Sequence, residues 1–134
     1  MDNQESMDKL VTCCFLEFTK QLREGNSNTI VIVPNARDNE INLMTANVAN
    51  AFAFFTETKV FFKMPKIKYL LWKILYHFPN QRYKDVKNAV EIVPCEFAHI
   101  VCKNSGVRIS TFISTYKEYY ELQTKRRFLK WGKL

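Results

Sequence analysis

The chain has 134 residues, of which 47% are hydrophobic and 25% charged, a composition too apolar for a chain that is disordered throughout. Its charge is divided unevenly. Residues 1–58 hold four basic and eight acidic side chains, a net of −4, whereas residues 59–134 hold sixteen and five, a net of +11. Such a basic C-terminal half favours binding to a negatively charged partner, such as a nucleic acid or an acidic protein surface.

The uncharged run 41–56 is shorter than the roughly 18 residues that a membrane span requires, and no signal-peptide pattern opens the chain. We therefore expect an intracellular protein, nuclear or cytoplasmic and not secreted, with no membrane partner. Its length suits one compact domain over residues 1–134, with an acidic N-terminal half and a basic C-terminal half. The four cysteines are expected to be thiols, most of them packed in the core.

The first half predicts two helices and two strands. Apolar side chains recur at helical spacing over residues 7–24, and Gly25 follows as a stop signal. The β-branched run 29–33 predicts a buried strand, and residues 59–63 predict a short second one. The Ala-rich residues 41–55 between them predict a buried helix.

The second half is predicted to be helical. Residues 65–78 open on a proline, and the predicted core stripe is aliphatic and aromatic: Ile67, Leu70, Leu71, Ile74, Leu75 and Phe78. A short amphipathic helix is expected over 83–93, another from Pro94 and a long one from about Ser110. The fold class is therefore α+β, predominantly α-helical, with five to six helices and a small two-stranded β element near 29–33 and 59–63.

A helix-turn-helix candidate lies near residues 94–124. Such a unit needs a small residue on its first helix, a Gly four residues later at the turn, and an apolar residue six beyond it. Cys102, Gly106 and Phe112 fall at those spacings, and the segment resembles helix-turn-helix proteins in this respect. The resemblance implies that the second helix reads base edges, and its candidate contacts are polar: Arg108, Ser110, Thr111, Ser114 and Lys117.

Residues 125–134 form a basic and aromatic tail that is a candidate flexible segment. Its candidate phosphate contacts are Lys125, Arg126, Arg127 and Lys130, and its candidate base-stacking rings are Phe128 and Trp131. The alternative is that the basic side chains complement the end of the preceding helix while both rings fold back onto the core.

Helix 65–78 carries a second, aromatic and basic side. Lys66, Tyr69, Trp72, Lys73 and Tyr76 gather opposite the predicted core stripe, with His77 beside them. Rings among lysines suit single-stranded nucleic acid or a protein interface. For Trp72 we favour burial in the core.

Metal and enzyme chemistry find little support. Cys95, His99 and Cys102 share a helical face but lack a second close ligand pair, so we expect neither a metal nor another cofactor. No phosphate loop, HExxH or GxSxG occurs, and we expect no enzyme. A Mg²⁺-dependent nuclease built on Asp38, Glu57 and Lys59 is the weakest hypothesis.

The sequence thus predicts a non-enzymatic nucleic-acid-binding protein, with DNA favoured over RNA. Its candidate contacts are the tail residues, the residues of the second helix, Lys66 and Lys73, with Tyr69, Tyr76, Phe128 and Trp131 as aromatic contacts. The alternative is a protein–protein interaction module, such as a viral structural or host-interference protein, that docks an acidic partner through its basic and aromatic face. A homodimer is a further candidate.

Overall fold

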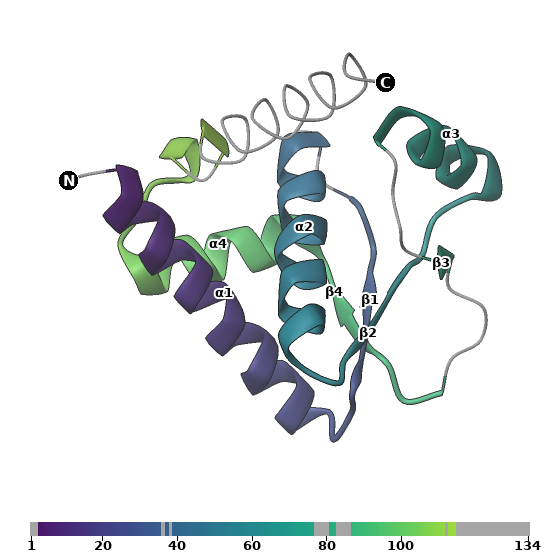
Figure 1. The fold of residues 1–134 in the computed structure, drawn as a ribbon, viewed down its shortest axis with the longest axis horizontal. Helices are drawn as coiled ribbons and strands as arrows, with labels where there is room; N and C mark the ends of the chain where they lie inside the picture. Colours follow the sequence, from purple (N-terminus) through teal and green to yellow (C-terminus); the bar gives the residue numbers. More distant parts are fainter. Residues whose placement is uncertain are drawn as a thin grey trace, which may run out of the picture.

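The computed structural model describes residues 3–35, 37, 39–76, 81–82, 87–111 and 113–114. These ranges form eight elements (Figure 1), which are in chain order α1 (Asn3–Glu24), β1 (Thr29–Ile32), α2 (Asn39–Phe55), β2 (Lys59–Phe62), α3 (Lys66–Tyr76), β3 (Gln81–Arg82), β4 (Val90–Ile92) and α4 (Pro94–Ser105). A further helical turn follows α4 at residues 109–111 and 113–114. The protein is thus a helix-dominated α+β structure, as the sequence predicts.

The strands form one parallel sheet in the order β3-β2-β1-β4. Ile30 of β1 pairs with Val60 of β2 on one side and with Val90 of β4 on the other. The strands expected near 29–33 and 59–63 are confirmed, but the two-stranded element was too small, because β3 and β4 extend both edges. Parallel neighbours require long crossovers, and α2 and α3 provide them after β1 and β2.

The helix expected over residues 83–93 is wrong where the structure describes it. Val90–Ile92 is strand β4, while residues 83–86 lie outside the described ranges. Val90 and Ile92 are β-branched and complete the hydrogen bonding of β1 at its open edge. The apolar residues of this segment follow helical spacing, but pairing with β1, some sixty positions earlier in the chain, makes the segment a strand.

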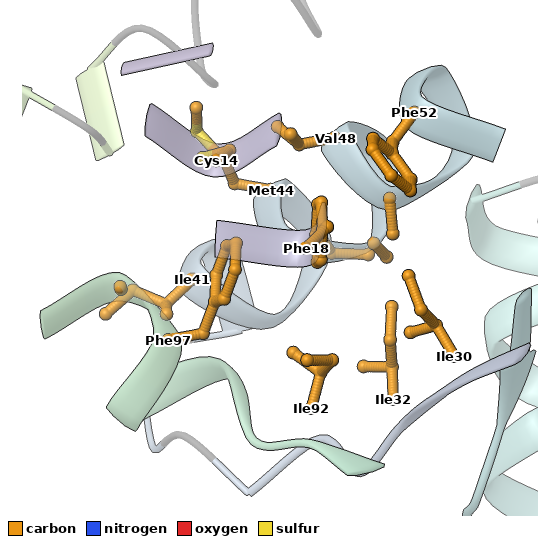
Figure 2. Close-up of a cluster of buried hydrophobic side chains, with 14 of the residues drawn as sticks. Cys14, Phe18, Ile30, Ile32, Ile41, Met44, Val48, Phe52, Ile92 and Phe97 are labelled. Carbon is orange, nitrogen blue, oxygen red and sulfur yellow. The ribbon is translucent and has the colours of Figure 1, made fainter. Parts of the chain in front are cut away.

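Helices α1, α2 and α4 lie against one another beside the sheet and enclose the core (Figures 1 and 2). Phe18 of α1 stacks on Phe97 of α4, with ring centroids 4.5 Å apart, and tilts against Phe52 of α2 at 5.3 Å. Ile30 and Ile32 of β1 approach this aromatic cluster from the sheet in Figure 2. Burial of such side chains contributes about 1.5–3 kcal/mol each.

Helix α3 reverses its predicted orientation. Trp72 is the side chain that it buries, at 4% exposure, whereas the aliphatic residues of the predicted core stripe are exposed: Ile67, Leu70, Leu71, Ile74 and Leu75. Phe78 lies outside the described residues. The spacing identifies which side chains share a face, but the neighbouring elements decide which face is buried. Burial of Trp72 itself is confirmed.

Two loops at the amino ends of β1 and β4 are tied together. The Asn88 side chain donates a hydrogen bond to the Asn26 carbonyl at 2.7 Å, and the Ser27 hydroxyl donates to the Asn88 carbonyl. A Cβ on Gly25 would lie 2.8 Å from Val90 Cγ2, so any larger residue at this position would force Val90 to move. The left-handed residue after α1 is Asn26 rather than the glycine.

In the described ranges no helix combines the length and apolarity that crossing a bilayer requires.

Candidate nucleic-acid interface

Local sequence signals define both ends of helix α4. Pro94 occupies its first turn, where a missing N–H costs nothing. Gly106 ends it at φ 74°, a left-handed angle that favours glycine, and donates its N–H to the Cys102 carbonyl at 2.9 Å. The Ser105 hydroxyl accepts the Val107 N–H at 3.2 Å. The tight glycine turn predicted from the sequence is therefore present.

The inner side of α4 is fixed in the core. Phe97, Ala98 and Val101 are buried, and the helix contacts both α1 and α2. The small Ala98 side chain is fully buried. Lys103 and His99 are exposed on the outer side. The first helix of the candidate unit is thus anchored by packing, and its outer side remains available to a ligand.

A second helical turn begins directly after the glycine turn. Val107 is buried, and residues 109–111 are helical, with the Thr111 N–H donating to the Arg108 carbonyl at 3.0 Å. The Ser114 hydroxyl donates a hydrogen bond to the Ser110 carbonyl, four residues earlier, at 2.9 Å. The predicted start near Ser110 is confirmed to within a residue.

The start of this second helix presents polar side chains to solvent. Arg108, Ser110 and Ser114 are exposed, and Thr111 is half-buried. Between Glu96 and residue 114 the sequence holds two basic residues, Lys103 and Arg108, and no acid. Sequence reasoning missed Lys103, whose signal was its position directly after half-buried Cys102 on the outward side of α4.

Several predicted contacts lie outside the described residues: Phe112, Lys117, Lys125, Arg126, Arg127, Phe128, Lys130 and Trp131. The structure therefore assigns them no position, and they remain predictions from the sequence.

Helix α3 exposes two of the predicted lysine contacts, whereas its described rings, Tyr69 and Trp72, are half-buried and buried. Lys66 and Lys73 are exposed, whereas Tyr69 is half-buried against the core, and its ring lies 5.4 Å from the Lys73 Nζ atom. The backbone of Tyr76 is described, as the last residue of α3. In Figure 1, α3 and the helical turn after α4 stand at opposite ends of the long axis. The structure thus separates two basic surfaces that the sequence treats as one half.

Three possible metal ligands on α4, Cys95, His99 and Cys102, differ in their exposure. Cys95 and His99 are exposed, Cys102 is half-buried, and burial raises the pKa of its thiol. His77 lies outside the described residues. Across the described part of the chain, no group of three or more His, Cys, Asp or Glu side chains is placed to hold a metal.

The nuclease arrangement would need acids from opposite ends of the neighbouring strands β1 and β2. Glu57 precedes the amino end of β2, whereas Asn39 begins α2 beyond the carboxyl end of β1. The four residues of β1 separate the two ends of that strand by about 13 Å. Asp38 itself lies outside the described residues. Glu57 and the residue that follows Asp38 therefore lie near opposite ends of neighbouring strands.

Comparisons with protein-family models, with curated proteins and with solved structures found no match for this chain. Function must therefore be argued from the two surfaces themselves.

Proposed function

We propose that this protein binds nucleic acid without catalysing a reaction, and that duplex DNA is preferred over RNA. The observation that carries the proposal is the glycine turn after α4. Gly106 at φ 74° fixes the start of a second helix, whose first residues Arg108, Ser110 and Ser114 are exposed. In helix-turn-helix proteins this position enters the major groove and contacts base edges.

The chemistry of this surface matches that role. Lys103 and Arg108 supply positive charge on either side of the turn, and basic contacts to phosphate dominate affinity for DNA. The hydroxyls of Ser110, Thr111 and Ser114 are suited to hydrogen bonds with bases. Packing of α4 against α1 and α2 lets the second helix be presented without a large ordering cost.

The remaining predicted contacts extend this proposal. Further phosphate contacts would come from the basic residues Lys117, Lys125, Arg126, Arg127 and Lys130. The rings of Phe128 and Trp131 would stack on exposed bases. We place the protein inside the cell, in the nucleus or the cytoplasm. A homodimer would set two such units on successive half-sites of a duplex.

The test is fluorescence anisotropy with labelled duplex DNA, single-stranded DNA and RNA, titrated from about 50 to 200 mM salt. The informative variant is Lys103→Ala/Arg108→Ala. If both side chains contact phosphate, the slope of log K against log salt becomes shallower by about two. The matched control is Lys20→Ala/Arg23→Ala, which removes one lysine and one arginine that are exposed on α1.

The proposal predicts the tightest binding to duplex DNA, weakened by the first variant and unchanged by the control. Equal losses in both variants would assign binding to net charge alone and remove the turn from it. Absence of binding to all three nucleic acids at low salt would overturn the proposal. The basic half would then be assigned to an acidic protein partner.

A further inference from the structure

Helix α3 presents an aliphatic face to solvent. Ile67 is 84% exposed and Ile74 73%, and the other members of the face are each about half exposed: Leu70, Leu71 and Leu75. Single exposed apolar side chains are ordinary, but five on one helical face indicate a surface that meets an apolar medium or partner.

Lysines border this face on both sides. At about 100° per residue, the five aliphatic residues occupy an arc of about 140°. Lys68 follows on one edge, where its Nζ atom lies 5.8 Å from the centre of the Trp72 ring. Lys66 and Lys73 follow on the other edge. The ammonium groups thus stand at the boundary between the exposed aliphatic face and the aromatic side that packs on the protein.

The charges around this face restrict what can cover it. The sequence holds no acid between Glu57 and Asp85. A second copy of α3 would bring lysines against lysines. The C-terminal segment 115–134 carries six basic and two acidic residues, so it would add like charge as well. The partner that complements the surface is apolar at its centre and anionic at its rim.

We propose that α3 is an interfacial membrane helix that lies in the plane of an anionic lipid surface. Its aliphatic side chains enter the boundary of the acyl chains, and Lys66, Lys68 and Lys73 extend to the phosphates of the headgroups. A lipid surface needs no matching groove, which suits a helix that stands at one end of the described structure (Figure 1). The expectation of no membrane partner rested on the lack of a spanning segment, which an interfacial helix does not require.

The experiment is cosedimentation of the full chain with vesicles of phosphatidylcholine containing about 30% phosphatidylserine, compared with pure phosphatidylcholine. The face is tested by Ile67→Ser/Ile74→Ser, and Phe54→Ser/Phe55→Ser is its control, because those rings are 82% and 74% exposed on α2. The rim is tested by Lys66→Gln/Lys68→Gln/Lys73→Gln, with Lys20→Gln/Lys59→Gln/Lys87→Gln as a control of equal charge. Circular dichroism checks that every variant remains folded.

We expect binding to the anionic vesicles alone, reduced about tenfold or more by each α3 variant and by neither control. Binding that survives Ile67→Ser/Ile74→Ser would reflect surface charge alone and would overturn the proposal. Equal losses in the controls would also overturn it. Absence of vesicle binding would overturn it too, and sedimentation velocity would then distinguish the alternatives. A dimer that Ile67→Ser/Ile74→Ser dissociates would identify a second copy as the occupant, and a monomer would favour an acidic protein groove.

Discussion

Helices α3 and α4 each follow the carboxyl end of a strand, yet they use their apolar faces in opposite ways. Helix α4 buries Phe97, Ala98 and Val101 between α1 and α2. Helix α3 buries Trp72 and turns its aliphatic face outward. The difference lies in the neighbours, because α4 enters a layer of helices and α3 stands apart from that layer (Figure 1). An apolar face is therefore evidence of core only where a partner is present to cover it.

The largest effect should separate the two apolar faces. Phe97→Ala should lower the free energy of unfolding by about 3–5 kcal/mol, because it removes a buried ring stacked on Phe18. Ile74→Ala should change it by less than about 0.5 kcal/mol, because that side chain is 73% exposed. Urea denaturation followed by circular dichroism measures both. A comparable loss for Ile74→Ala would place the aliphatic face of α3 in the core and remove the contrast.

The second effect lies within α3 itself. Trp72→Ala should destabilise the protein by about 3 kcal/mol, since Trp72 is a buried member of the core cluster on α3. Leu75→Ala should be close to neutral by the same measurement, because that side chain is about half exposed. The reverse ranking would mean that α3 packs on the face predicted from the sequence.

These contrasts show what the sequence could and could not predict about the fold. The β-branched run at β1, Pro94 at the start of α4 and the glycine after it are local signals, and each placed its element or turn correctly. Strand β4 was missed because Val90 and Ile92 become a strand only through pairing with β1. The buried face of α3 depends in the same way on distant neighbours.

The candidate interface likewise contains features that local sequence predicts and features that depend on distant neighbours. Gly106 and the start of the next helix were predictable from spacing alone. The exposure of Lys103 and Arg108 was not, because it follows from the burial of Val101 and Val107 beside them. Separation of α3 from this turn along the long axis is a property of the sheet order, which no local pattern specifies (Figure 1).

A smaller effect tests the turn that ends α4. Gly106→Ala should lower the free energy of unfolding by about 1–2 kcal/mol, because alanine disfavours a φ of 74°. An added Cβ would meet no atom within 4 Å, so no steric clash contributes. The cost is then purely one of backbone conformation, and Gly106→Asn should recover part of it in thermal unfolding. If alanine were tolerated as well as glycine, the left-handed turn would not be required.

The smallest effect is the pH dependence of stability that the buried Cys14 of α1 causes. Burial raises the pKa of the Cys14 thiol above its ordinary value of 9.0, with smaller contributions from Cys13 and Cys102. Above pH 9.0 the Cys14 thiol loses its proton in the unfolded state but keeps it in the folded state. The contribution of this group to stability is therefore complete well below pH 9 and falls as pH rises. The loss from this group is about 0.8 kcal/mol at about pH 9.5. Denaturation of Cys14→Ala should show a shallower fall, and an unchanged slope would contradict the burial.

The most direct test of the division between the two surfaces is the affinity for one labelled duplex DNA at about 100 mM salt. It is measured by anisotropy for Lys103→Ala/Arg108→Ala beside Ile67→Ser/Ile74→Ser. Nucleic-acid binding through the turn after α4 predicts a loss of about tenfold or more for the first variant and no change for the second. A loss confined to the α3 variant, or an equal loss in both, would contradict that assignment.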